Sequence, residues 1–203
     1  MNALVVIDLQ NDFMPGGALA VPKGDEIVSL INDLQQKFEL VIATQDWHPS
    51  GHSSFASSHK NAREFEIIKI DGLDQILWPE HCIQNSEGAK FHPDLNSSRI
   101  EAIFRKGTDI KIDSYSGFYD NAHLKSTGLT GYLKEKKVKR IYFVGLAAEY
   151  CVYFSIKDAI SEGFECILIE DATRALDEGE FEKARIDILR KGGKIISSQE
   201  LVI

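Results

Sequence analysis

The fold is decided first by residues 3–9, ALVVIDL, an apolar run that only Asp8 interrupts. Such a run is typical of a buried strand. Between residues 24 and 38 the apolar residues recur at helical spacing, and a second apolar run follows at residues 40–43. A strand, a helix and a strand in this order predict one βαβ unit, in which the two strands are parallel.

The same alternation returns in the second half of the chain. It predicts three strands and two helices, and the second helix ends at Gly192-Gly193, where a left-handed C-cap is available. The predicted segments are the strands 141–145, 166–169 and 194–196, a helix with Val152, Ile156, Ala159 and Ile160 on one face, and a helix over 179–190. The pattern indicates the α/β class with a mostly parallel sheet.

Residues 45–131 differ from the flanking segments, because their periodicity is poor and His, Ser, Trp and Pro are frequent. Only residues 102–104 form a clear strand candidate there. Long irregular loops inside a compact domain usually carry function. Since no repeat, low-complexity tract or linker-like run interrupts the chain, we expect residues 1–203 to form a single domain.

Composition argues against several classes of protein. The 203 residues include 31 Asp and Glu against 23 Lys and Arg, and a formal charge of −8 disfavours nucleic acid and anionic lipid as partners. No apolar run approaches the roughly 20 residues of a membrane span, and no basic region precedes the first run as in a secretory signal. Three widely spaced cysteines argue against a disulfide framework. We expect a cytoplasmic protein with no membrane partner, and the sequence leaves open whether it forms a homo-oligomer.

Three polar residues fall at the ends of predicted strands, where open parallel sheets bind their ligands. Asp8 interrupts a buried strand, Lys106 follows the strand candidate, and Cys151 lies near the first turn of a helix, which lowers a thiol's pKa and can bind an oxyanion. Each alone has an ordinary structural interpretation, as a hydrogen-bonded acid, a solvated lysine or an inert core cysteine. Together they form a constellation suited to acyl transfer, with the thiol as nucleophile.

A second set of residues has the spacing of metal ligands. Asp46 and His48 stand two residues apart, so in extended chain they share a face, and His52 or His81 would complete the set. Nitrogen and oxygen ligands with open water positions suit zinc, iron or manganese. The alternative is that these histidines only hydrogen-bond the backbone, and Cys82 is either a thiolate ligand or a core residue.

Four aromatic residues lie in polar segments rich in Gly and Pro. They are Phe13, Trp47, Trp78 and Tyr115. Aromatic side chains in such segments either line a pocket for a flat ligand or pack in the ordinary way.

Seven segments, in this order, resemble the nicotinamidase (pyrazinamidase) branch of the isochorismatase-like hydrolases. The first and the last are shared by the whole superfamily, whereas Asp-Trp-His-Pro at 46–49 and Trp-Pro-Glu-His-Cys at 78–82 are more specific to nicotinamidases. The resemblance extends from residue 3 to about residue 175. The seven segments are residues 6–13, 45–55, 78–82, 88–93, 105–107, 113–118 and 145–152.

The resemblance implies a three-layer α/β/α fold and the hydrolysis of nicotinamide to nicotinate and ammonia, a step of NAD salvage, with pyrazinamide as a further substrate. By motif, it implies that Cys151 is the nucleophile, Asp8 the acid and base, and Lys106 the cation that holds the aspartate and the thiolate. It also implies that Phe13 and Trp78 form the aromatic walls of the pocket.

A metal site is also implied by the resemblance. One divalent ion, zinc first with iron or manganese as variants, is expected on Asp46, His48 and His81, where it coordinates the pyridine nitrogen. Ser54 occupies a place where some members of the family supply another ligand, and His52 is the neighbouring candidate.

An oxyanion hole is implied at the backbone N–H groups of Ala147 and Cys151, with a cis peptide bond before Ala147. The chain departs from the family pattern at Ala148 and Glu149, where Thr and Asp are usual. Because the oxyanion donors are backbone groups, we expect activity to survive this departure.

Two other functions remain open at this point. Another hydrolase of the superfamily, acting on a vinyl ether or on a different amide, is not expected to need the metal cluster. A silent module that only binds its ligand is disfavoured, because Asp8, Lys106 and Cys151 are all present. Ammonia release from nicotinamide and the metal content of the protein distinguish the three functions.

Overall fold

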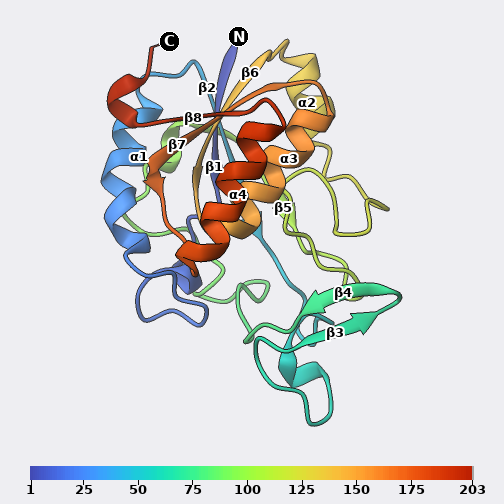
Figure 1. Cartoon of the computed structure of the whole chain (residues 1–203). Coiled ribbons are helices and arrows are strands. Elements are labelled where there is room, and N and C mark those ends of the chain that lie inside the picture. Colours follow the sequence, from blue (N-terminus) through green and yellow to red (C-terminus); the bar gives the residue numbers. More distant parts are fainter. Residues whose placement is uncertain (203) are drawn as a thin grey trace.

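A parallel sheet of six strands forms the centre of the computed structural model, which describes residues 1–202 (Figure 1). The strands are β1 (Asn2–Ile7), β2 (Leu40–Asp46), β5 (Ile100–Lys106), β6 (Arg140–Gly145), β7 (Glu165–Thr173) and β8 (Lys194–Ile196). Their order across the sheet is β5-β2-β1-β6-β7-β8, and every neighbouring pair is parallel. The first strand of the chain therefore lies in the middle of the sheet.

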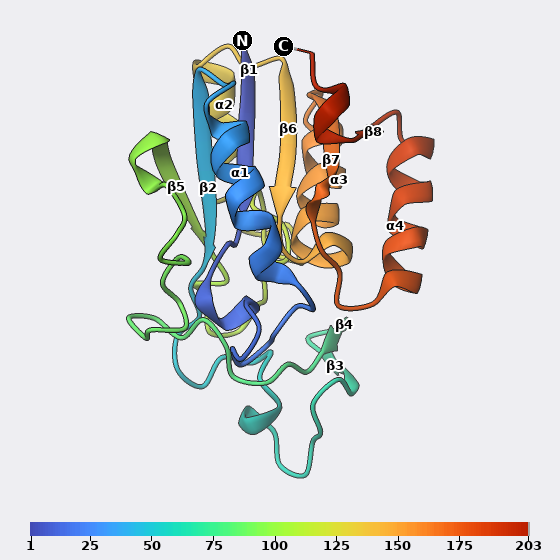
Figure 2. The ribbon, with the colours of Figure 1, turned by 90° about the vertical axis from the view of Figure 1, so that its left-hand side faces the viewer.

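Helices cover both faces of this sheet. They are α1 (Val28–Gln35), α2 (Leu129–Glu135), α3 (Tyr153–Ser161) and α4 (Glu178–Arg190). Figures 1 and 2 show α1 on one face and the other three helices on the opposite face. Successive side chains of a strand point to opposite faces, so Leu4 and Val6 pack with α1 while Ala3, Val5 and Ile7 pack with the other helices. The expected three-layer α/β/α arrangement is confirmed.

The predicted segments agree with the observed ones in kind and differ at their ends. The first strand stops at Ile7 because Asp8 adopts a left-handed backbone, with φ of 44°. The helix predicted over 24–38 begins as a 3₁₀ turn, Gly24–Ile27, and becomes α-helical only at Val28. The predicted left-handed cap is present at Gly192, where φ is 90°.

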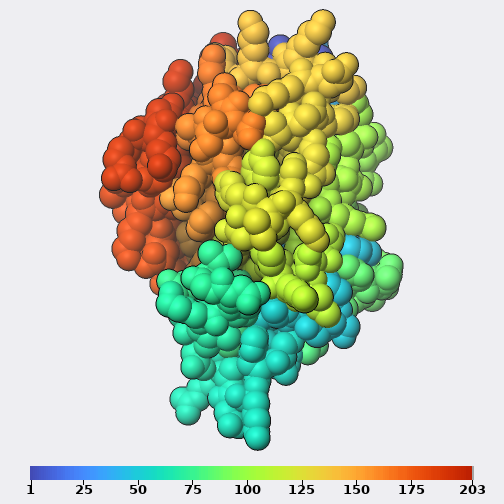
Figure 3. Space-filling view, turned by 90° about the vertical axis from the view of Figure 1, so that its right-hand side faces the viewer, coloured from blue at the N-terminus to red at the C-terminus, as the bar shows by residue number. Residues whose placement is uncertain are grey.

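Two elements have no counterpart in the sequence-based prediction. One is α2, which has seven residues, and the other is an antiparallel hairpin of β3 (Ile67–Ile70) and β4 (Leu73–Ile76). Elements this short do not produce a recognisable period. The hairpin lies beyond the carboxyl ends of the sheet strands (Figure 1), and Figure 3 shows the cyan and teal part of the chain, to which it belongs, protruding from the rest of the molecule.

No helix within residues 1–202 combines the length and the apolar character that crossing a membrane requires.

The strands β1 and β6 approach each other closely at their carboxyl ends. Gly145, the last residue of β6, pairs with Ile7 and has φ of 111°. A Cβ atom at this position would lie 2.1 Å from the Ile7 carbonyl oxygen. Only glycine tolerates both the conformation and the contact, so Gly145 permits the approach of the two segments that follow these strands.

We expect Gly145→Ala to lower the free energy of unfolding by about 3 kcal/mol, the upper end of ordinary single substitutions. Gly131→Ala is the matched control, because nothing lies within 4 Å of a Cβ there and alanine in a helix is better than glycine by about 1 kcal/mol. Denaturant unfolding of both variants measures the difference. Equal unfolding midpoints of the two variants would contradict the conclusion that β1 and β6 can approach closely only with glycine at position 145.

Candidate active site

A buried lysine, aspartate and cysteine meet beyond the carboxyl ends of the sheet strands. Lys106 is the last residue of β5, Asp8 follows β1, and Cys151 lies in a π-helical turn, Ala148–Val152, between β6 and α3. The Lys106 Nζ is 2.9 Å from the Asp8 Oδ2 and 3.3 Å from the Cys151 Sγ. The exposed fractions are 2% for Lys106, 0% for Asp8 and 7% for Cys151. The three groups are thus held together away from water.

Lys106 also contacts a second carboxylate. Its Nζ lies 3.1 Å from the Asp46 Oδ1 and donates a hydrogen bond of 2.9 Å to the Ser114 carbonyl. Burial lowers the pKa of Lys106, but the carboxylates of Asp46 and Asp8 outweigh this effect and raise the pKa well above its usual value. The lysine is therefore a fixed cation between two anions.

Burial dominates the protonation of the other two groups. It raises the pKa of Asp8 above its usual value, against the opposing charge of Lys106. It also raises the pKa of the Cys151 thiol, again with Lys106 opposing. The expectation that the helix start lowers the thiol's pKa is wrong, because desolvation disfavours the thiolate more strongly. The thiol therefore needs a base before it can act as a nucleophile, and Asp8 is the adjacent carboxyl.

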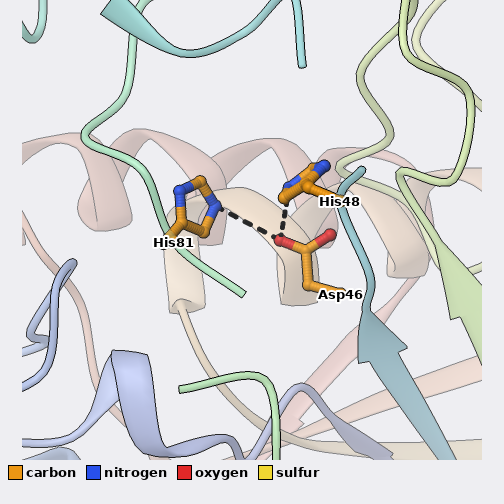
Figure 4. A group of neighbouring side chains, drawn as sticks. All are labelled: Asp46, His48 and His81. Atoms are coloured by element: carbon orange, nitrogen blue, oxygen red, sulfur yellow. Dashed lines mark hydrogen bonds and ion pairs between the residues drawn. The ribbon is translucent and has the colours of Figure 1, made fainter. Parts of the chain in front are cut away.

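Asp46, His48 and His81 form a compact group of side chains (Figure 4). The Asp46 Oδ2 lies 3.0 Å from the His48 Nε2 and 3.4 Å from the His81 Nε2. These atoms lie within 4.8 Å of one another and all three residues are buried. Burial raises the pKa of Asp46, but His48 and Lys106 outweigh it and hold the pKa well below its usual value. The Asp46 side chain is thus an ionised carboxylate, whose oxygen atoms can coordinate a metal ion.

The two imidazoles are oriented as metal ligands usually are. The Nδ1 of His48 lies 3.0 Å from the Gly107 carbonyl, and the Nδ1 of His81 lies 2.8 Å from the Pro79 carbonyl. A carbonyl only accepts, so each Nδ1 carries the hydrogen and each Nε2 is the ring nitrogen that faces Asp46. Burial lowers the pKa of His48, but the Asp46 carboxylate outweighs burial and raises it, so a positive charge is favoured at this point. One carboxylate oxygen and two ring nitrogens that converge there fit a divalent metal ion.

The two additional ligand candidates lie beside this group. The Ser54 Oγ is 2.8 Å from the His52 Nδ1, so these side chains engage each other. The His52 ring packs on His48 with centroids 4.4 Å apart, and His52 and His48 also form a second group of close ligand atoms, with Asp113. Cys82 belongs to neither group and lies in the hydrophobic core with no exposed surface.

A pocket of about 340 Å³, its mouth included, opens beside Cys151 and the metal-ligand group. Phe13, Trp78 and Tyr115 line it, whereas Trp47 lies apart, under the Arg105 guanidinium at 3.8 Å. The remaining lining residues are Leu19, Asp46, His81, Asp113, Ala147, Tyr150, Cys151 and Leu176. The aromatic wall fits a small flat ring whose substituent reaches the thiol.

The peptide bond between Leu146 and Ala147 is cis, as expected. Ala147 lines the pocket beside Cys151. No backbone carbonyl within residues 1–202 accepts a hydrogen bond from the Ala147 N–H, which leaves this donor available to a ligand. Nearby, the Glu149 Oε1 accepts hydrogen bonds from the backbone N–H groups of Leu176 and Asp177, at 2.9 and 2.8 Å. Glu149, one of the two residues that depart from the family pattern, thus connects the turn that carries Cys151 to Leu176 in the pocket wall.

Several further residues, which the sequence did not single out, hold these groups in place. The Thr44 Oγ1 donates to the Asp8 Oδ1 at 2.7 Å. The Gln10 side chain accepts from the Asp46 N–H and donates to the Asp46 carbonyl, both at 2.8 Å. The Asp12 Oδ2 accepts from the Cys82 N–H at 2.7 Å. Asp8, Gln10 and Asp12 are alternate residues directly after a buried strand, and this polar series is the signal that could have identified them.

The comparisons with known proteins agree with this geometry. The Isochorismatase domain family matches residues 2–200. A nicotinamidase of Escherichia coli is 45% identical over 180 residues, which cover 87% of this chain and 84% of that protein. A solved nicotinamidase and pyrazinamidase of Acinetobacter baumanii superposes with a TM-score of 0.97 at 46% identity, over 99% of this chain and 98% of its own.

A third relative was solved with a metal ion. The pyrazinamidase of Pyrococcus horikoshii, in complex with zinc, superposes with a TM-score of 0.80 at 37% identity, over 97% of this chain and 98% of its own. These matches confirm the resemblance to nicotinamidases found in the sequence. They cover almost the whole chain, and the chain therefore belongs to the isochorismatase domain family.

Proposed function

We propose that this chain is a nicotinamidase, an amidohydrolase that converts nicotinamide and water to nicotinate and ammonia and that also hydrolyses pyrazinamide. The observation that carries the proposal is the buried contact of Lys106 with Asp8 and Cys151 at the edge of an aromatic pocket. The relatives named above are nicotinamidases and pyrazinamidases. The reaction belongs to NAD salvage, and the three free cysteines suit a reducing compartment such as the cytoplasm.

Binding in this proposal uses the two sides of the pocket. The pyridine ring lies between Phe13 and Trp78, with its carboxamide toward Cys151. Asp46, His48 and His81 would hold one divalent ion, zinc first with iron or manganese as alternatives, because one carboxylate and two imidazoles suit these metals. When bound, such an ion supplies a Lewis acid for the ring nitrogen.

The proposed chemistry starts with a proton transfer. Asp8 accepts the proton of the Cys151 thiol, and the sulfur attacks the carboxamide carbon. The backbone N–H groups of Ala147 and Cys151 stabilise the oxyanion. Asp8 returns the proton to the nitrogen as ammonia leaves, and a thioester remains. The elevated pKa of Asp8, caused by burial, makes this carboxylate a better proton acceptor near neutral pH.

The second half of the cycle releases the acid. A water molecule gives a proton to Asp8 and attacks the thioester, and the proton then passes to the sulfur as nicotinate leaves. Lys106 holds its place throughout, because its Nζ contacts both Asp8 and Cys151. Its positive charge stabilises the thiolate that forms when the aspartate takes the proton.

We expect Lys106→Met to lower the free energy of unfolding by about 3–5 kcal/mol, since it leaves two buried carboxylates without their cation. The carboxylates raise the pKa of Lys106 above that of a lysine in the unfolded chain. The contribution of its charge to the free energy of unfolding is therefore complete below about pH 10, and it is lost only as the pH rises through the raised pKa of the folded state. Denaturant unfolding near neutral pH measures the loss. Lys111→Met is the control, because Lys111 is exposed. If Lys106→Met loses no more free energy of unfolding than this control, Lys106 does not stabilise the fold through the two buried carboxylates.

We expect Cys151→Ala and Asp8→Asn each to lower kcat by about 10,000-fold or more, because each removes one member of a group that acts as a unit. Ammonia release from nicotinamide measures the effect, and the unfolding midpoint checks the fold. Cys166→Ala is the matched control, since Cys166 is a buried cysteine that does not line the pocket, and burial raises its pKa to about 12. Robust turnover by either purified variant would remove that residue from the mechanism.

Removal of the metal tests the remaining part of the proposal. We expect about one divalent ion per chain by elemental analysis, loss of ammonia release after chelation, and recovery when metal returns. The unfolding midpoint of the chelated protein shows whether the chain stays folded. If metal-replete protein releases no ammonia from nicotinamide, the proposed function is wrong, and other amides and vinyl ethers become the substrates to test.

A further inference from the structure

Phe65 is unusual in two respects. Its side chain is 58% exposed although it is a large aromatic residue. Its backbone is left-handed, with φ of 66°, a conformation that costs free energy for a bulky residue and that glycine adopts freely. A residue kept in such a conformation points to a role for its side chain.

The base of the β3–β4 hairpin determines what Phe65 touches. The Phe65 N–H donates to the Leu77 carbonyl at 2.6 Å, and the Leu77 N–H donates to the Glu66 carbonyl at 2.8 Å. These bonds place Phe65 beside the residue that precedes Trp78. The Phe65 and Trp78 rings meet edge to face, with centroids 6.0 Å apart and planes at 87°, which is a favourable aromatic geometry.

Trp78 is the pocket residue that this contact affects. Its exposed fraction is 4%. Its ring also meets the Tyr150 ring at 4.9 Å, and its Nε1 donates to the Tyr115 hydroxyl at 3.2 Å. Tyr115 and Tyr150 both line the pocket, whereas Phe65 does not. Phe65 thus contacts a pocket residue, Trp78, without lining the pocket itself.

We propose that Phe65 is a positioning residue that holds the Trp78 indole against a bound aromatic amide and so sets the affinity of the site. The inference deepens the proposed function and rests on it. Phe65 touches neither the substrate nor the reacting atoms. Its loss therefore weakens binding of the flat ring and leaves the chemical step at Cys151 unchanged.

Steady-state kinetics of Phe65→Ala and Phe65→Gly test this inference. We expect KM for nicotinamide to rise about three- to tenfold, the range for loss of one aromatic contact, with kcat unchanged within about twofold. Glycine adopts the left-handed conformation freely. Phe65→Gly therefore removes the ring without the backbone strain that alanine would keep, and it distinguishes the effect of the lost ring from an effect of lower stability. Phe65→Tyr keeps an aromatic ring at this position, and we expect its KM to equal that of the unmodified protein. Ile67→Ala is the matched control, because Ile67 is 64% exposed on the same hairpin.

Fluorescence gives a readout that does not depend on turnover. The chain has two tryptophans, so in a Trp47→Phe background Trp78 is the sole emitter. We expect Phe65→Ala in this background to shift the emission to the red and to increase quenching by acrylamide, and Ile67→Ala to do neither. An unchanged KM in both Phe65 variants, or an equal rise in Ile67→Ala, would overturn the inference. Absence of turnover in the unmodified protein would instead refute the proposed function, while the fluorescence result would still decide whether Phe65 holds Trp78.

Discussion

One buried ammonium group determines the charge of the whole site. Lys106 Nζ contacts the Asp8 and Asp46 carboxylates, the Cys151 sulfur and one carbonyl. Two carboxylates against one lysine leave a net negative charge among buried side chains, which is costly. A second cation beside Asp46 relieves this charge, and the two imidazoles that face the same carboxylate would hold it. The charges of the metal-ligand group and of the cysteine site therefore depend on each other, because Lys106 contacts both.

The sheet order explains why these groups meet. Across the sheet, β5, β2, β1 and β6 are consecutive neighbours. Their carboxyl ends supply Lys106, Asp46, Asp8 and the turn that carries Cys151, in that order. Parallel strands present these ends at one edge, and Asp46 is the register partner of Lys106. The long segment between β2 and β5 then adds His48, His81 and Trp78, and the loops after β1 and β5 add Phe13 and Tyr115. The strand ends thus supply the charges, and the loops supply the aromatic wall of the pocket.

Local pattern predicts the strands well, because buried parallel strands are uninterrupted apolar runs such as residues 3–7. It also singles out Asp8, Lys106 and Cys151, since these residues follow buried strands at the end of a parallel sheet where ligands bind. It does not find Thr44, which bonds to Asp8 only because β1 and β2 are neighbours. Local pattern does not distinguish Trp47 from Trp78, and only the family resemblance assigns Trp78 to the pocket. In the structure Trp78 lines the pocket, and Trp47 packs under Arg105. Residue roles were predicted by resemblance, and their support is the geometry around Lys106.

The proposed reaction depends on a covalent acyl intermediate that the buried thiol of Cys151 forms with the substrate. Rapid acid quench of the enzyme during turnover of nicotinamide, followed by mass spectrometry of its peptides, tests this directly. We expect one nicotinoyl group on the peptide that contains Cys151, formed in step with the first equivalent of ammonia and absent from Cys151→Ala. Full ammonia release with no modified cysteine at any quench time would contradict it.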